Sequence, residues 1–184
     1  MEGNEQLAVI IPMLKKVGAG IAPEQLDGPT PCASFSVEGV LDHMTGLASA
    51  YAPAFRGDAP PIGGTTTTDD DSAVRFQHAM DALLDAVESP GALQRTIGTP
   101  FGPMLGSTFA RLVAFDGLIH GWDLATSTGQ TWDPPVEVVA EVDTFARQAI
   151  APEMRDGDVF AQATEPPIDA TQLLRLVAFS GRTI

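Results

Sequence analysis

Cysteine is almost absent from this sequence: Cys32 is the single cysteine in 184 residues. One cysteine excludes an intrachain disulfide and a zinc site built from several thiolates. We therefore expect the chain to fold on its hydrophobic core alone, in a reducing compartment, for which the cytoplasm is the simplest choice. The role of Cys32 stays open, because a cysteine that packs as a small apolar side chain is several times more common than a nucleophilic one.

Basic residues and long apolar runs are also scarce. The 10 Lys and Arg residues face 24 Asp and Glu residues, which gives a formal net charge of −14. A chain this acidic repels polyanions, so we expect neither nucleic acid nor an anionic membrane among its partners. No stretch approaches the roughly 20 apolar residues of a membrane span. The apolar residues 7–14 follow Glu2 and Glu5 instead of the basic residues of a secretion signal, which again favours a cytoplasmic protein.

The sequence also lacks alternating strand patterns, internal repeats and a glycine-rich phosphate loop after a strand. It contains instead a series of helical patterns joined by loops rich in Pro and Gly. We expect helices at roughly residues 5–17, 36–51, 70–89, 107–128, 133–150 and 169–180. This pattern predicts one all-α domain over residues 1–184, a helical bundle with extra short helices and an irregular C-terminal segment.

Three segments are expected to be non-helical. Residues 57–71 are rich in Thr, Gly, Pro and Asp, a composition typical of a long flexible loop or of plain disorder. We expect residues 94–104 to be irregular, with a short extended piece near residues 95–97. Residues 160–167 are predicted to form a strand or an extended tail that crosses the bundle.

Polar residues mark the expected helix ends. Ser36 is placed to cap the second helix, and Ser107 to cap the fourth. Gly129 is placed to end the fourth helix. Asp133 and Pro134 are expected to be the N-cap and the first residue of the fifth helix.

The second helix has one apolar face. At 100° per residue, a continuous stripe is formed by Val37, Val40, Leu41, Met44, Leu47, Ala48 and Tyr51. His43 lies about 40° outside this stripe, at the edge of the face that we expect to meet the core. Taken alone, this position is more typical of a half-buried structural histidine than of a ligand.

The fourth helix carries polar residues on its apolar face. That face is defined by Phe109, Leu112, Val113 and Ile119. Asp116, His120 and Asp123 fall on the same face, where a carboxylate is costly unless it is paired or bound to a metal. Asp116 and His120 are four residues apart and therefore neighbours on the helix surface, so they can bind one ion. His43, from another helix, is the best-placed third ligand.

Two alternatives to this metal site stay open. Asp116 can simply hydrogen-bond His120, and Asp123 can pair with Arg147 or Arg111. The third histidine, His78, projects opposite the apolar stripe of its helix and is predicted to be solvated.

Two ordered motifs resemble signatures of a bacterial family. The first comprises Pro29-Thr30-Pro31-Cys32, Phe35, Val37, Leu41 and His43. The second comprises Asp116, His120-Gly121-Trp122-Asp123-Leu124-Ala125 and Thr128-Gly129, and the segment from Leu174 to Gly181-Arg182 resembles the closing segment. In this order they resemble the metal-binding branch of the DinB-like superfamily, of actinobacterial type, close to the N-terminal domain of mycothiol-dependent maleylpyruvate isomerase.

The resemblance implies a DinB-like four-helix core with a metal site of three protein ligands, His43, Asp116 and His120. Three ligands leave a position for water or substrate. This sequence differs from the isomerase itself in three respects. At the position of the isomerase's glutamate ligand, this sequence has the shorter Asp116. The isomerase also has an additional C-terminal domain, and this sequence runs to Ile184 without one. Its substrate-binding arginines have no counterpart that we can assign. We therefore do not expect isomerase activity.

The expected function is that of a divalent-metal-dependent enzyme of the thiol S-transferase kind, using mycothiol or a similar small thiol against an electrophilic substrate. Zinc suits two histidines and a carboxylate, with nickel, iron and manganese as alternatives. Asp123 is expected to orient a ligand from outside the metal's own shell. The alternatives are a metal-dependent hydrolase and a non-catalytic metal-binding or stress-response protein.

Self-association is a further expectation that the resemblance suggests, because related bundles often pair. The first helix carries an apolar face that could serve a homodimer or could equally be core. It consists of Leu7, Ile10, Ile11 and Leu14.

Overall fold

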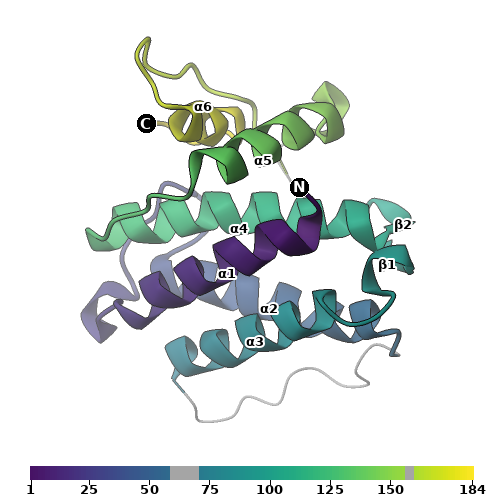
Figure 1. The fold of residues 1–184 in the computed structure, drawn as a ribbon. Coiled ribbons are helices and arrows are strands. Elements are labelled where there is room, and N and C mark those ends of the chain that lie inside the picture. The colour runs from purple at the N-terminus through teal and green to yellow at the C-terminus, as the bar shows by residue number, and fades with distance from the viewer. Residues whose placement is uncertain (59–70, 156–159) are drawn as a thin grey trace.

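The structure, a computed structural model, describes residues 1–58, 71–155 and 160–184. These ranges contain six α-helices, as the sequence predicts, and one short β-hairpin (Figure 1). The helices are α1 (Gly3–Ala19), α2 (Val37–Arg56), α3 (Ser72–Val87), α4 (Gly106–Thr128), α5 (Val136–Ala149) and α6 (Gln172–Phe179). The hairpin consists of β1 (Thr96–Thr99) and β2 (Gly102–Leu105). Three 3₁₀ turns complete the elements: Pro23–Gln25, Ala92–Gln94 and Pro152–Met154.

The four long helices α1 to α4 form the bundle, and α5 and α6 lie on the opposite side of α4 (Figure 1). Helix α4 packs against α1, α2 and α5, so it is enclosed by neighbours instead of having one solvent face. The expected all-α fold is confirmed. No helix in the described ranges is long and apolar enough to cross a membrane.

The apolar stripes predicted for α1 and α2 lie in the core. Leu7, Ile10, Ile11 and Leu14 of α1 are 0–1% exposed, so the face proposed for self-association is used inside the chain. In α2 the stripe is buried at its N-terminal end, and Leu47 and Tyr51 are half-buried. The core therefore takes up the apolar side chains that the helical period selects.

Two predicted helix ends are confirmed and one is wrong. Ser36 caps α2, with its Oγ accepting a hydrogen bond from the Gly39 N–H at 3.1 Å, and α4 ends before Gly129, whose φ is 69°. Helix α2 continues past Tyr51 to Arg56 although Pro53 lies inside it. Burial of Ala52 and Phe55 outweighs the hydrogen bond lost at the proline.

Two predicted helix starts are also wrong. Helix α4 begins at Gly106 because β2 runs directly into it, so Ser107 is not its N-cap. Helix α5 begins at Val136, three residues after Asp133. The second of the two prolines at positions 134 and 135 is the cause, because a proline disfavours helical geometry in the residue before it.

The hairpin lies in the segment for which the sequence predicts irregular structure with a short extended piece near residues 95–97. Strand β1 confirms that extended piece, whereas its pairing with β2 is not predicted. Its strands pair antiparallel, with Thr96 opposite Leu105 and Ile97 opposite Met104. Ile97 is 1% exposed, so the hairpin contributes to the core. Residues 161–167 form an extended tail and no strand, and Thr164 donates its N–H to the Ala178 carbonyl at 2.9 Å. The loop predicted at residues 57–71 lies largely outside the described residues.

A glycine in α4 is required by close packing. A Cβ on Gly121 would lie 2.3 Å from the ring of Trp132. We expect Gly121→Ala to lower the free energy of unfolding by about 1–3 kcal/mol, because the ring must move out of a packed position. Chemical denaturation measures this change. In the described part of the chain a Cβ on Gly46, within α2, meets no atom within 4 Å. Gly46→Ala should therefore raise the stability by about 0.5–1 kcal/mol. A Gly121→Ala variant as stable as the wild type would contradict the packing argument.

Candidate metal centre

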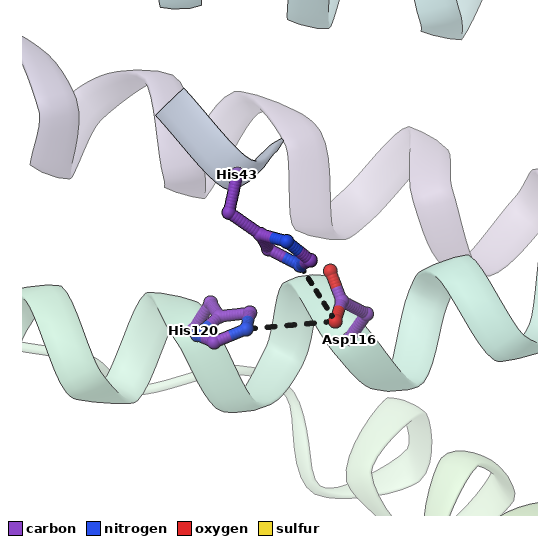
Figure 2. A group of neighbouring side chains, drawn as sticks. All are labelled: His43, Asp116 and His120. Carbon is purple, nitrogen blue, oxygen red and sulfur yellow. Dashed lines mark hydrogen bonds and ion pairs between the residues drawn. The ribbon is translucent and has the colours of Figure 1, made fainter. Parts of the chain in front are cut away.

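Three side chains from two helices meet in one cluster. His43 comes from α2, and Asp116 and His120 come from α4 (Figure 2). His43 Nε2 lies 3.3 Å from Asp116 Oδ1, and His120 Nε2 lies 3.5 Å from the same oxygen. One donor atom from each of the three residues lies within 4.8 Å of the others. The structure therefore brings together the three residues that the sequence predicts as ligands.

The arrangement follows from helix geometry. Asp116 and His120 are one turn apart on α4 and present their polar atoms to the same side. His43 lies at the edge of the α2 stripe, so its ring reaches across the α2–α4 contact to the other two residues. The centroids of the two imidazole rings are 4.9 Å apart.

The cluster is buried at one end and open at the other. The side chain of His120 is 6% exposed, whereas those of His43 and Asp116 are 31% and 29% exposed. Solvent and small molecules can thus reach the cluster from the side of His43 and Asp116.

Phe35 forms one wall of this opening. Its ring stacks on His43 at 5.2 Å between centroids and meets the His120 ring edge-on at 6.0 Å. The backbone of Phe35 is held by the loop of residues 30–36, where its N–H donates to the Cys32 carbonyl and its own carbonyl accepts from the Thr30 hydroxyl. The sequence marked Phe35 as part of a motif and gave no sign of this contact.

His120 is anchored from behind by Asp123. Its Nδ1 lies 3.0 Å from Asp123 Oδ2, and Asp123 is 0% exposed. A buried carboxylate accepts hydrogen bonds, so this contact assigns the proton of neutral His120 to Nδ1. The Nε2 lone pair of His120 then faces the cluster and is free to bind a cation.

The partner of Asp123 is Arg182, and neither of the arginines expected from the sequence contacts it. Arg182 donates from Nη2 to Oδ2 at 2.8 Å and from Nε to Oδ1 at 3.3 Å. Arg147 pairs with Asp143, and Arg111 lies 3.8 Å from Glu141. The position of Asp123 on an apolar face signalled that a cation must be near, but Arg182 is 59 residues away along the chain.

The donor set fits a divalent ion. Two ligands bonded to zinc at about 2.0–2.2 Å in a tetrahedral arrangement lie about 3.3–3.6 Å apart. The two imidazole-to-carboxylate distances of 3.3 and 3.5 Å match this spacing. Two imidazole nitrogens and a carboxylate oxygen are also the ligand types of catalytic zinc sites. His78 is exposed on α3 as expected, and neither it nor Cys32 belongs to the cluster identified in the described residues.

The cluster shifts the pKa values of two of its members. The hydrogen bond with Asp116 raises the pKa of His43 above its ordinary 6.5, against the opposing effect of burial. Burial pushes the pKa of Asp116 up, but its interactions with His120 and His43 outweigh burial and hold that pKa below its ordinary 3.8.

A pH-dependent contribution to stability follows for the metal-free protein. Because the pKa of His43 is raised, the contribution of His43 to the free energy of unfolding is full below pH 6.5. This contribution is lost as pH rises through the folded-state pKa. Because the pKa of Asp116 is lowered, the contribution of Asp116 to the free energy of unfolding is full above pH 3.8. This contribution is lost as pH falls through the folded-state pKa. The pair should therefore stabilise the fold most between these two values.

Denaturation of wild type and Asp116→Asn in chelator, from pH 4 to 9, measures this contribution. The difference in free energy of unfolding between the two proteins should shrink on the alkaline side. A difference that is constant with pH would contradict the assigned shifts. His78→Ala is the control and should follow the wild-type profile.

Comparison with known proteins places the chain in a family. Two uncharacterized proteins of Mycobacterium tuberculosis, MT0763 of strain CDC 1551 and Rv0738 of strain H37Rv, are each 32% identical to it over 167 residues, which is 90% of this chain and 90% of each relative. No solved structure matches the chain significantly. The model of the mycothiol maleylpyruvate isomerase N-terminal domain matches residues 11–125, which include all three residues of the cluster. The helical DinB-like fold agrees with this match, while membership of the metal-binding branch stays a prediction. The chain therefore belongs to the mycothiol maleylpyruvate isomerase N-terminal domain family.

Proposed function

We propose that the protein is a divalent-metal-dependent enzyme of the thiol S-transferase kind, which activates a small thiol such as mycothiol. The observation that carries this proposal is the convergence of His43, Asp116 and His120 at ligand-like distances. The family match supports the thiol, because the family is named for a mycothiol-related enzyme.

His43, Asp116 and His120 would hold the metal. Zinc suits two histidines and a carboxylate best, and nickel, iron and manganese are alternatives. When bound, a divalent ion lowers the pKa of a thiol or water molecule that coordinates to it.

The protein's own groups prepare this site. Asp123 keeps the proton of His120 on Nδ1, so that Nε2 stays a free donor. Phe35 stacks on the His43 ring and contacts the His120 ring edge-on, so it packs against both imidazoles. The exposed edges of His43 and Asp116 are where a thiol and an electrophile would enter.

The reaction is a substitution at carbon. With an aryl chloride as electrophile, the thiol proton passes to solvent, a sulfur–carbon bond forms, and chloride leaves with the electron pair of the broken carbon–chlorine bond. The thiol is therefore consumed in equal amount with the electrophile.

Elemental analysis and a thiol-dependence assay test the proposal. Protein purified without a His-tag should contain close to one divalent metal per chain. Turnover of 1-chloro-2,4-dinitrobenzene should require a thiol, with mycothiol compared against glutathione and no thiol, and should be lost after chelation. Turnover of ester substrates without thiol would favour a hydrolase. Metal binding without turnover of either substrate class would favour a non-catalytic metal-binding protein.

A further inference from the structure

Arg182 connects the C-terminal segment to the metal-binding cluster. It follows α6 and the turn at Gly181, whose φ of 97° reverses the chain. Its guanidinium contacts both oxygens of Asp123 and donates from Nη1 to the Ser180 carbonyl at 3.3 Å. The side chain is 14% exposed, so this contact lies largely away from solvent.

The contact fixes the orientation of the Asp123 carboxylate. Arg182 meets the two oxygens with two different nitrogens, which is the arrangement that restricts rotation of a carboxylate most. One of these oxygens, Oδ2, also faces Nδ1 of His120 at 3.0 Å. A carboxylate that is held in this orientation holds the His120 ring in its own orientation as well.

The tautomer of His120 depends on this chain of contacts. With an acceptor at Nδ1, the proton of the neutral ring stays there and Nε2 is free toward Asp116. Without an oriented acceptor, the proton can move to Nε2, which is the nitrogen that a cation needs.

The backbone around Arg182 is itself anchored. Its N–H donates to the Val177 carbonyl at 3.3 Å, and its carbonyl accepts from the Thr164 hydroxyl. The tail of residues 160–167 and the end of α6 thus set where the guanidinium lies, although neither contributes a residue to the cluster.

We propose that Arg182 is a positioning residue of the cluster, which holds Asp123 so that His120 keeps its proton on Nδ1 and offers Nε2 to a metal. The metal part of this inference rests on the proposed function, whereas the tautomer part does not. A site between α2 and α4 is therefore completed by a residue from the C-terminal segment, outside the matched residues 11–125.

The tautomer is measured directly on metal-free protein by long-range ¹H–¹⁵N spectra of the imidazole rings. The sequence has 3 histidines, so the signals can be assigned with His78→Ala and His43→Ala variants. Wild-type His120 should carry its proton on Nδ1. Arg182→Gln should shift the population toward Nε2, and Arg182→Lys should restore part of the wild-type signal.

Zinc affinity, measured by competition with a chromogenic chelator, is the second readout. Arg182→Gln should weaken zinc binding by about 10–100-fold, the usual effect of losing a group that supports a ligand. Arg175→Gln is the matched control, because Arg175 lies on α6 and donates only to backbone carbonyls, those of Ala170 and Ile168, in the contacts described. Its tautomer signals and zinc affinity should equal those of the wild type within twofold.

Two results would overturn the proposal. The first is that His120 of the wild type carries its proton on Nε2. This result does not depend on the folding of any variant. The second is a folded Arg182→Gln variant with unchanged tautomer signals and unchanged zinc affinity. If the wild type binds none of zinc, nickel, iron and manganese, the proposed function fails, and the tautomer comparison alone decides the role of Arg182.

Discussion

Replacing His120 with alanine is expected to weaken zinc binding by more than about 100-fold, beyond the range for losing a supporting group. His120 is the most buried member of the cluster, and its Nε2 is oriented by Asp123 before any ion arrives. The cluster would keep only His43 and Asp116 as donors. Chelator competition at constant pH measures the change.

Two further variants sharpen this test. Asp116→Asn should also weaken binding strongly, because the site loses its single carboxylate among the three donors. His78→Ala should leave the affinity unchanged, since His78 is exposed on α3. If His120→Ala binds zinc as tightly as the wild type, the metal lies elsewhere and the proposed site is wrong.

Replacing Asp123 with alanine is expected to lower the free energy of unfolding by about 3–5 kcal/mol, the usual cost of leaving one partner of a buried ion pair alone. Asp123 is 0% exposed, and its removal leaves the Arg182 Nε and Nη2 groups and the His120 Nδ1–H without this acceptor. In a chain of this size the loss corresponds to a fall in Tm of roughly 6–20 °C. Thermal and urea unfolding in the presence of chelator measure it.

A double variant distinguishes the cost of an unpaired buried charge from the cost of lost packing. Asp123→Ala combined with Arg182→Met should recover part of the loss, because no buried charge is then left unpaired. The control is Asp143→Ala, which breaks the pair with the exposed Arg147 and should cost less than about 1 kcal/mol. An Asp123→Ala variant as stable as Asp143→Ala would contradict the buried-pair argument.

The parts of the fold that the sequence predicted are those that local periodicity encodes. The stripe on α2 and the position of Ser36 follow from side chains three or four residues apart, and they predicted the buried face and the start of that helix. The cluster was predictable for the same reason. Asp116 and His120 are one turn apart on one helix, and of the other two histidines in the sequence only His43 lies at the edge of an apolar stripe.

The features that the sequence did not predict depend on contacts distant along the chain. Nothing near Asp123 identifies Arg182, so the sequence offered Arg147 and Arg111 instead, and both pair with other carboxylates. Of the hairpin, the sequence predicted only a short extended piece near residues 95–97, because strands of four residues are too short to show an alternating pattern. Burial of Ile97 fixes the hairpin against the core. The wall that Phe35 forms arises from the loop of residues 30–36, which has no periodicity.

The enclosure of α4 has a consequence for how this protein can diverge. From position 113 to position 125 every residue is buried except Asp116 and Trp122, which are half-buried. A helix packed on all sides tolerates few replacements at any position. Each change in side-chain volume either leaves a cavity or forces a neighbouring side chain to move. Two of the three cluster residues therefore lie in the segment with the least freedom to vary. New specificity would have to arise on the open side instead, from α2 around His43 and from the loop that carries Phe35.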